Sequence, residues 1–243
     1  MRADERAPMN ERPSISAMFP CYNDARTIGR LVDDVHAALV DLTDEMEVIV
    51  VNDGSADDSR EVLAAMTPSR PWLRVINHEQ NRGYGGALIS GFTAARYEWI
   101  FYTDGDGQYD ASEAALLVPL ATDQVDVVQG YKIGRGDSLL RKVIGRTYHH
   151  VVKLLFRLQG RDTDCDFRLF RRQLVIDRPL HSTSGIICVE LMRNFRDAGA
   201  RLVETPVHHY FRPHGKSQFF RLPAIGRSAG QLLRFWWVRV VRS

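Results

Sequence analysis

The chain has 243 residues, of which 26% are charged and 44% hydrophobic, the composition of an ordinary globular protein long enough to bury a full core. Its formal net charge of +2 argues against a nucleic-acid-binding protein. No uncharged run reaches the about 20 residues that a membrane-spanning helix needs. The three cysteines lie far apart, without disulfide or metal-ligand spacing, so we expect a reducing, cytosolic environment.

Residues 1–13 are charged, contain proline and lack the apolar stretch of a signal peptide, so we expect a flexible leader. From there on, short apolar runs alternate with amphipathic segments. The predicted strands are 14–20, 48–51, 73–77, 99–102, 125–130 and 201–207. The predicted helices are 25–42, 57–66, 87–96, 111–120, 148–158 and 185–198. This alternation predicts an α/β, Rossmann-like fold with an open, mostly parallel sheet flanked by helices.

The most informative stretch follows the fourth predicted strand and reads Thr-Asp-Gly-Asp-Gly-Gln over residues 103–108. Asp104 and Asp106 are two residues apart, so on an extended chain their carboxylates share one face. Two such carboxylates can hold Mg²⁺ or Mn²⁺ against a diphosphate, and the intervening glycines leave room for the anion. The alternative interpretation is an Asp-Gly turn between two elements.

Two earlier predicted strands also end in acidic loops, which carry Asp24 and Asp53. Because parallel strands present their carboxyl ends at one edge of a sheet, we expect these acids to converge with Asp104 and Asp106 on one crevice. The glycine-rich segment 81–86 follows the third strand. It predicts either a close approach of backbone to an anion at a helix start or a simple tight turn.

With these motifs the chain resembles family 2 glycosyltransferases of the GT-A fold, and more narrowly dolichyl-phosphate mannose synthase and related polyprenyl-phosphate sugar synthases. The resemblance covers roughly residues 14 to 220. The motifs that carry it, in chain order, occupy 19–24, 52–59, 81–87, 103–108, 162–168 and 212–217. It implies a catalytic domain over 14–218, with a nucleotide-sugar half at 14–130 and an acceptor half at 131–218.

The resemblance also implies roles for the residues at matching positions. The nucleoside pocket would be lined by Pro20, Tyr22 and Asp24, with Asp53 reading the base edge and Gly83 in the glycine-rich loop beside it. The metal and diphosphate would be held by Asp104, Asp106 and Gln108, and the phosphates covered by Arg212, Lys216 and Ser217. The chain departs from the family pattern at Asp24, where Glu is commoner, and at Asp166, where the mannose synthases usually carry Gly.

Basic residues punctuate the acceptor half from Lys132 to Arg146. Guanidinium groups match phosphate oxygens in bidentate fashion, so this segment suits a phosphate-bearing acceptor, although a solvated basic face is the alternative. The family position favours a lipid phosphate bound by Arg135 and Arg141, with Arg168 as a third candidate. Further on, three histidines (His208, His209 and His214) have no carboxylate or thiol partner at zinc-site spacing and predict a basic loop.

The C-terminal segment 219–243 interleaves large apolar side chains with five arginines. Each arginine costs about 2.5–3.5 kcal/mol at mid-bilayer, so a spanning helix is disfavoured. Arginine and tryptophan on an amphipathic helix suit a membrane surface, and packing on the catalytic domain or on a partner subunit is the alternative. We expect a cytoplasmic protein, peripherally associated with the cytoplasmic face of the membrane.

Together these features predict a metal-dependent, inverting glycosyltransferase. It would move a sugar from a nucleotide diphosphate sugar, GDP-mannose or a UDP-sugar, to a polyprenyl (dolichyl) phosphate. One alternative is an enzyme of the same family that acts on a hydroxyl of a soluble or secondary-metabolite acceptor. Another is a non-catalytic, membrane-associated scaffold that retains the nucleotide-binding fold, which the presence of the acidic residues disfavours.

Overall fold

The structure is a computed structural model that describes residues 12–133, 149–210 and 230–242. Seven strands form one sheet in the order β3-β2-β1-β4-β6-β5-β7. Their bounds are β1 Ile15–Cys21, β2 Met46–Asn52, β3 Leu73–Asn77, β4 Trp99–Thr103, β5 Val127–Ile133, β6 Phe167–Arg171 and β7 Leu202–His208. The helices are α1 Ile28–Leu39, α2 Ser59–Met66, α3 Tyr84–Ala94, α5 Gln173–Asp177 and α6 Ile187–Asp197, with further helical residues at 149–156 and 230–241.

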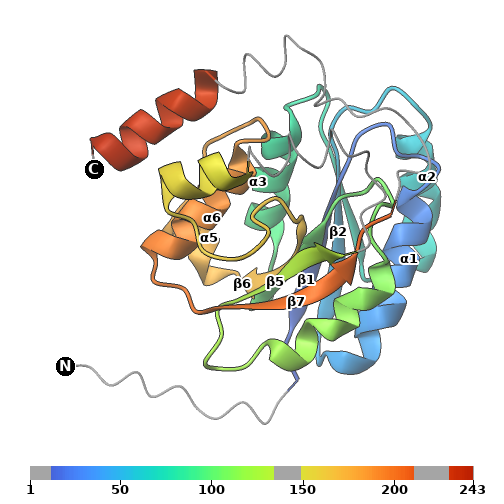
Figure 1. Cartoon of the computed structure of the whole chain (residues 1–243). Helices are drawn as coiled ribbons and strands as arrows, with labels where there is room; N and C mark the ends of the chain where they lie inside the picture. Colours follow the sequence, from blue (N-terminus) through green and yellow to red (C-terminus); the bar gives the residue numbers. More distant parts are fainter. Residues whose placement is uncertain (1–11, 134–148, 211–229, 243) are drawn as a thin grey trace.

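The sheet is buried on both faces, and the side chains of its strands alternate between two cores. Val48 and Val50 of β2 belong to the core that α1 and α2 line, whereas Ile49 and Val51 belong to the core that α3 and α6 line. The helices accordingly form two layers, with α1 and α2 on one side of the sheet and α3, α5 and α6 on the other (Figure 1). This double burial explains why β2 is a continuous apolar run in the sequence.

The strand order reverses direction at β1. The chain passes from β1 through β2 to β3 on one side, and then returns to β4 on the other side of β1. Strands β1, β2, β3 and β4 are parallel, so their carboxyl ends lie at one edge of the sheet. The point of reversal at this edge is where open α/β sheets bind ligands.

The predicted α/β architecture is confirmed, with differences in detail. Strand β6 was not predicted, and it runs antiparallel to both β4 and β5. The segment predicted as a helix over 111–120 forms two short 3₁₀ helices, η3 (Ala111–Leu116) and η4 (Val118–Leu120), with Pro119 in the first turn of η4. The first predicted helix begins later than expected, at Ile28, after a turned loop.

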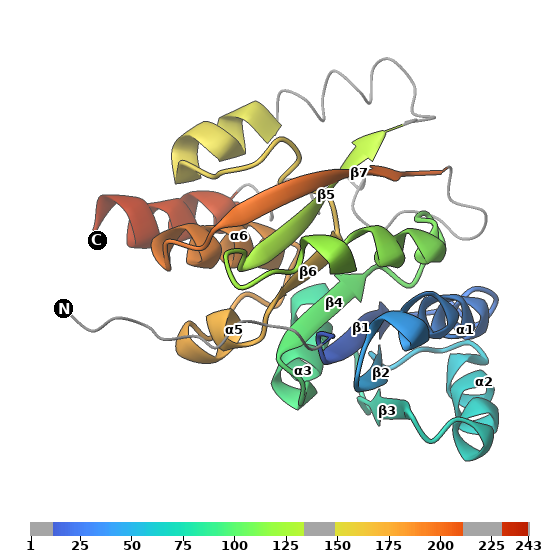
Figure 2. The same ribbon diagram turned by 90° about the horizontal axis from the view of Figure 1, so that it is seen from below.

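The C-terminal helix packs on the body of the protein. Leu232 is buried in the core that α3 and α6 line, and Trp236 packs partly buried against this core. Trp236 Nε1 donates to the Leu155 carbonyl at 3.0 Å. The ring of Phe235 stacks on Phe156 with centroids 5.5 Å apart. Figure 2 shows this helix, in red, beside the helix at 149–156, in yellow. Of the helices in the described ranges, none is both long enough and apolar enough to cross a membrane.

Candidate functional site

The loops that follow β1, β2 and β4 interlock at the carboxyl edge of the sheet. The backbone N–H of Asp53 donates to the Cys21 carbonyl at 2.9 Å. The hydroxyl of Thr27 donates to the Gly105 carbonyl at 2.9 Å, which ties the loop after β1 to the loop after β4. The predicted convergence of these acidic loops on one edge is therefore present in the structure.

Asp53 lies at the end of β2 and is 3% exposed. Its Oδ1 accepts a hydrogen bond from the backbone N–H of Arg82 at 2.8 Å and lies 2.6 Å from His78 Nδ1. A buried carboxylate needs such partners because desolvation otherwise penalises its charge. Asp53 is thus held from two sides by the segments that follow β3.

The glycine-rich segment 81–86 forms the start of α3 and connects the two acidic positions. Gly83 has φ +83°, and a Cβ on Gly85 would lie 2.1 Å from the Ser182 carbonyl oxygen, so both positions require glycine. Between these two glycines, Tyr84 begins α3 and donates its hydroxyl hydrogen to Asp104 Oδ1 at 2.7 Å. The segment therefore contacts Asp53 through its backbone and Asp104 through a side chain.

Asp104 and Asp106 follow β4 on one short loop with Gln108. Asp106 Oδ1 accepts from the backbone N–H of Gln108 at 3.1 Å, and Gln108 Nε2 donates to the Tyr210 carbonyl at 3.1 Å. Burial, followed by the nearby carboxylates of Asp166 and Asp106, raises the pKa of Asp104 well above its ordinary value.

Crowded carboxylates of this kind fit a hard divalent cation, which would relieve their mutual repulsion. Mg²⁺ is commonly held by one or two carboxylates together with substrate phosphates. Asp104 and Asp106 supply such a pair of carboxylates. Bound there, the cation would supply charge neutralisation for a diphosphate.

Asp166 is a polar residue of this site to which no role was given from the sequence. Its Oδ1 accepts from the Tyr102 hydroxyl at 2.7 Å and from Cys188 Sγ at 3.3 Å. It stands where mannose synthases usually carry glycine, and this departure was the available signal. Asp166 adds a third carboxylate to the environment of Asp104.

Arg168 differs from its predicted role as a ligand of a lipid phosphate. Its side chain is completely buried, and its guanidinium donates to Gln129 Oε1 at 2.5 Å, the Tyr102 hydroxyl at 2.5 Å and the Thr163 carbonyl at 2.7 Å. Its Nη1 also lies 3.5 Å from Asp166 Oδ1. These partners occupy the guanidinium inside the core, where no lipid phosphate reaches it.

Several predicted residues lie outside the described part of the chain. They are Arg135, Arg141, Arg212, His214, Lys216 and Ser217.

Of the residues predicted to line the nucleoside pocket, Pro20 is buried near the end of β1, and Tyr22 is 39% exposed beside Asp24. The backbone N–H of Tyr22 lies 3.3 Å from Asp24 Oδ2.

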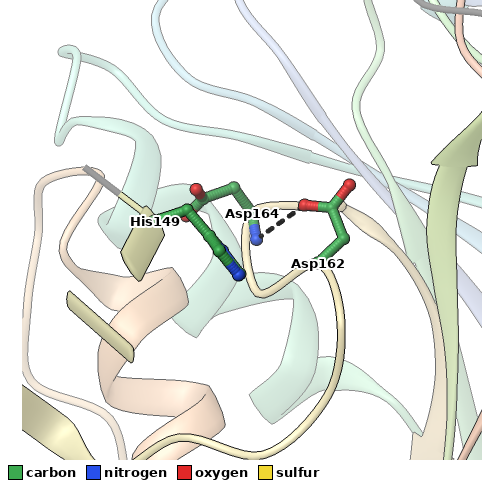
Figure 3. A group of neighbouring side chains, drawn as sticks. All are labelled: His149, Asp162 and Asp164. Atoms are coloured by element: carbon green, nitrogen blue, oxygen red, sulfur yellow. Dashed lines mark hydrogen bonds between the residues drawn. The ribbon is translucent and has the colours of Figure 1, made fainter. Parts of the chain in front are cut away.

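A second group of possible cation ligands comprises His149, Asp162 and Asp164, and no metal role was predicted for any of them (Figure 3). Their ligand atoms lie within 4.8 Å of one another. Lys132 Nζ lies 3.9 Å from Asp162 Oδ1 and donates to the Asp164 carbonyl, so a fixed positive charge already accompanies these carboxylates.

Of the other histidines, His208 pairs with Glu113 through Nδ1 at 2.5 Å.

Solved structures share this fold. Glucosyl-3-phosphoglycerate synthase from Mycobacterium tuberculosis, solved with Mn²⁺, UDP and glucosyl-3-phosphoglycerate, superposes with a TM-score of 0.70 at 20% identity, covering 93% of this chain and 80% of that one. The mannosyltransferase PcManGT from Pyrobaculum calidifontis, solved with GDP-Man and Mn²⁺, gives 0.68 at 20% identity, covering 100% and 68%. The fold is the GT-A fold, as predicted.

Residues 16–178 match the model of glycosyl transferase family 2, and the chain belongs to this family. Among curated proteins, an undecaprenyl-phosphate 4-deoxy-4-formamido-L-arabinose transferase from Yersinia pestis bv. Antiqua (strain Angola) is 31% identical over 207 residues. The counterpart from Yersinia pseudotuberculosis serotype O:3 (strain YPIII) has the same identity. The match covers 84% of this chain and 62% of each relative, so the chain spans less than two thirds of their length.

Proposed function

We propose that the protein transfers a sugar from a nucleotide diphosphate sugar to a polyprenyl phosphate, with Mg²⁺ or Mn²⁺ at Asp104 and Asp106. The observation that carries this proposal is the meeting of Asp53 and Asp104 at the reversal point of the sheet, where one glycine-rich segment contacts both. In this proposal Asp53 binds the nucleobase, and Asp104 holds the cation at the diphosphate. The names of the similar proteins, which include polyprenyl-phosphate transferases and enzymes bound to UDP or GDP-Man, support the substrate classes.

In this reaction an oxygen of the acceptor phosphate attacks the anomeric carbon of the sugar. The bond from that carbon to the diphosphate oxygen breaks, and its electron pair leaves with the nucleoside diphosphate. A phosphate monoester is already anionic near neutral pH, with a second pKa of about 6, so attack needs no strong general base. Attack from the face opposite the leaving group inverts the anomeric centre, which would give a β-linked product from an α-linked donor.

The negative charge that grows on the departing diphosphate is the main electrostatic demand of this step. Asp104 and Asp106 would meet it by holding the divalent cation. Tyr84 orients Asp104, and the backbone of Gln108 does the same for Asp106. The predicted phosphate contacts of Arg212, Lys216 and Ser217 remain part of the proposal, as do those of Arg135 and Arg141 on the acceptor side.

A lipid acceptor requires that the protein reach a membrane surface. The exposed side of the C-terminal helix could bind to such a surface. While Leu232 and Trp236 pack inward, Leu233 and Trp237 are 59% and 51% exposed on the outward side. Leu154 of the neighbouring helix is 79% exposed. Apolar side chains beside the arginines of this helix suit the headgroup region of a bilayer, with the apolar side chains immersed about 5–10 Å. We propose that the protein lies on the cytoplasmic face of the membrane through this surface.

The test is a transfer assay on the full chain with Mn²⁺, in which radiolabelled GDP-mannose and several UDP-sugars are each offered with undecaprenyl phosphate. Parallel reactions contain a long-chain alcohol or a free sugar in place of the lipid phosphate. The proposal expects labelled lipid from at least one donor and only with the phosphate acceptor. Transfer to hydroxyl acceptors alone would assign the alternative substrate class, and absence of transfer together with absence of nucleotide binding would reject the proposal.

A further inference from the structure

A chain of hydrogen-bonded side chains extends from Asp53 into the protein. His78 follows β3 at the same edge of the sheet and is 6% exposed. Its Nδ1 lies 2.6 Å from Asp53 Oδ1, and its Nε2 lies 2.9 Å from the hydroxyl oxygen of Ser90 on α3. Both ring nitrogens are therefore occupied, and the imidazole bridges the loop after β2 to α3.

The chemistry of the partners determines where the ring proton lies. An ionised carboxylate only accepts hydrogen bonds, so the contact with Asp53 requires a proton on His78 Nδ1. The Ser90 hydroxyl can then donate to Nε2 or accept from it, because a hydroxyl does both. The contact with Ser90 prevents the ring from turning away from Asp53.

The arrangement assigns different surroundings to the two oxygens of Asp53. Oδ1 takes the hydrogen bonds from His78 and from the backbone of Arg82. In the part of the chain that the structure describes, no hydrogen bond reaches Oδ2. Uracil and guanine both carry a ring N–H. Of the two carboxylate oxygens of Asp53, Oδ2 is the one that can accept a hydrogen bond from this N–H.

We propose that His78 is a positioning residue for nucleotide binding: held by Ser90, it fixes the Asp53 carboxylate so that Oδ2 faces the N–H edge of the nucleobase. This inference rests on the proposed function, because it takes the nucleobase as the ligand of Asp53. His78 does not contact the nucleotide in this arrangement. It acts through Asp53, and its effect should fall on the affinity for the nucleotide more than on the transfer step.

Two amide substitutions separate this role from a merely structural one. The amide nitrogen of Asn at position 78 can occupy the place of Nδ1 and donate to Asp53, whereas that of Gln reaches the place of Nε2 near Ser90. Nucleotide affinity is measured by calorimetry with UDP and GDP in Mn²⁺ on the full chain. His78→Gln should weaken binding about tenfold or more and raise KM more than it lowers kcat, and His78→Asn should retain most of the affinity.

His36→Gln serves as the matched control. His36 lies in the last turn of α1 and stacks on Trp72, which precedes β3 at the opposite edge of the sheet, so this variant should leave nucleotide affinity unchanged. Equal affinities for the Asn and Gln variants would overturn the positioning role while leaving the proposed function intact. A wild-type chain that binds neither nucleotide would instead refute the proposed function, and this inference with it.

A spectroscopic measurement on the unmodified chain keeps the inference testable if the variants fail to fold. Long-range ¹⁵N–¹H spectra of the imidazole should place a proton on Nδ1 of His78, and the signals should shift when UDP or GDP is added with Mn²⁺. A ring with its proton on Nε2 alone, or signals that stay in place at saturating nucleotide, would overturn it.

Discussion

The contact between Tyr84 and Asp104 connects the glycine-rich segment to the predicted cation ligands. The Tyr84 hydroxyl lies 2.7 Å from Asp104 Oδ1 at the centre of a crowded group of carboxylates. Burial, and then the charge of Asp104, raises the pKa of Tyr84 well above its ordinary value, so this phenol stays protonated and donates. In the proposed function, Tyr84 fixes Oδ1 of Asp104 and leaves Oδ2 for the cation.

We expect Tyr84→Phe to weaken Mn²⁺-dependent nucleotide binding by about tenfold, which corresponds to about 1.4 kcal/mol. The substitution removes one hydrogen bond and keeps the ring, so the fold should persist. Tyr97→Phe is the control, since Tyr97 lies before β4 at the opposite edge of the sheet and no hydrogen bond of its hydroxyl is found within the described residues. Calorimetry that finds the two variants equal to the wild type would contradict this role for Tyr84.

The positions of individual site residues could be predicted where an acidic residue directly follows a predicted strand. Asp53 and Asp104 each follow an apolar run, so their place at the sheet edge could be predicted. The partners of these acids could not be read from local pattern, because His78, Arg82 and Tyr84 reach them from a different part of the chain. His78 did offer a signal, since it directly follows the third predicted strand at the same edge.

Among the elements, β6 is the strand that local pattern failed to reveal. Its sequence contains Arg168 and Arg171, whose charges suggest a surface segment, and yet every residue of β6 is buried. The structure resolves this conflict by satisfying each guanidinium internally: Arg171 pairs with Glu98 and stacks over Trp99, and Arg168 is bound within the core. Such compensation depends on tertiary contacts, which strand propensity does not encode.

The C-terminal helix presents two adjacent tryptophans to different environments. Trp236 is partly buried against the core and donates to the Leu155 carbonyl, and Trp237 is 51% exposed. From the sequence, this segment could contact a membrane, a partner subunit or its own catalytic domain. One side of the helix binds its own domain, and the outward side remains for the bilayer in the proposed function.

We expect Trp236→Ala to lower the free energy of unfolding by about 3 kcal/mol, because it empties a packed site and removes a hydrogen bond. Trp237→Ala should change it by less than about 0.5 kcal/mol. For binding to vesicles that contain anionic lipid, Trp237→Ala should have the larger effect of the two and weaken association about tenfold. Urea denaturation and vesicle sedimentation measure the two effects. Unaltered vesicle binding by the Trp237 variant would count against the membrane surface.

At the scale of the whole molecule, strand order places the candidate site. The chain builds β1, β2 and β3 in one direction and then returns to β4 on the other side of β1, so that loops distant in sequence meet at one edge. Alternation of apolar and amphipathic segments predicted a parallel α/β sheet. It did not predict the order of the strands, because that order depends on which helices cover which face. The strand order places β2 and β4 on either side of β1, and this brings Asp53 and Asp104 to the same part of the sheet edge.

The most direct test of the account is calorimetry of UDP and GDP binding to the full chain, with Mn²⁺ and then with EDTA, for the wild type and for Asp104→Ala. Asp110→Ala is the control, since Asp110 caps η3 through Ser112 a short distance along the same loop. The account predicts that the wild type binds at least one nucleotide with Mn²⁺. Chelation of the metal and Asp104→Ala should each weaken this binding at least about tenfold, and Asp110→Ala should not. Nucleotide binding of the same strength with EDTA and in the Asp104 variant would contradict it.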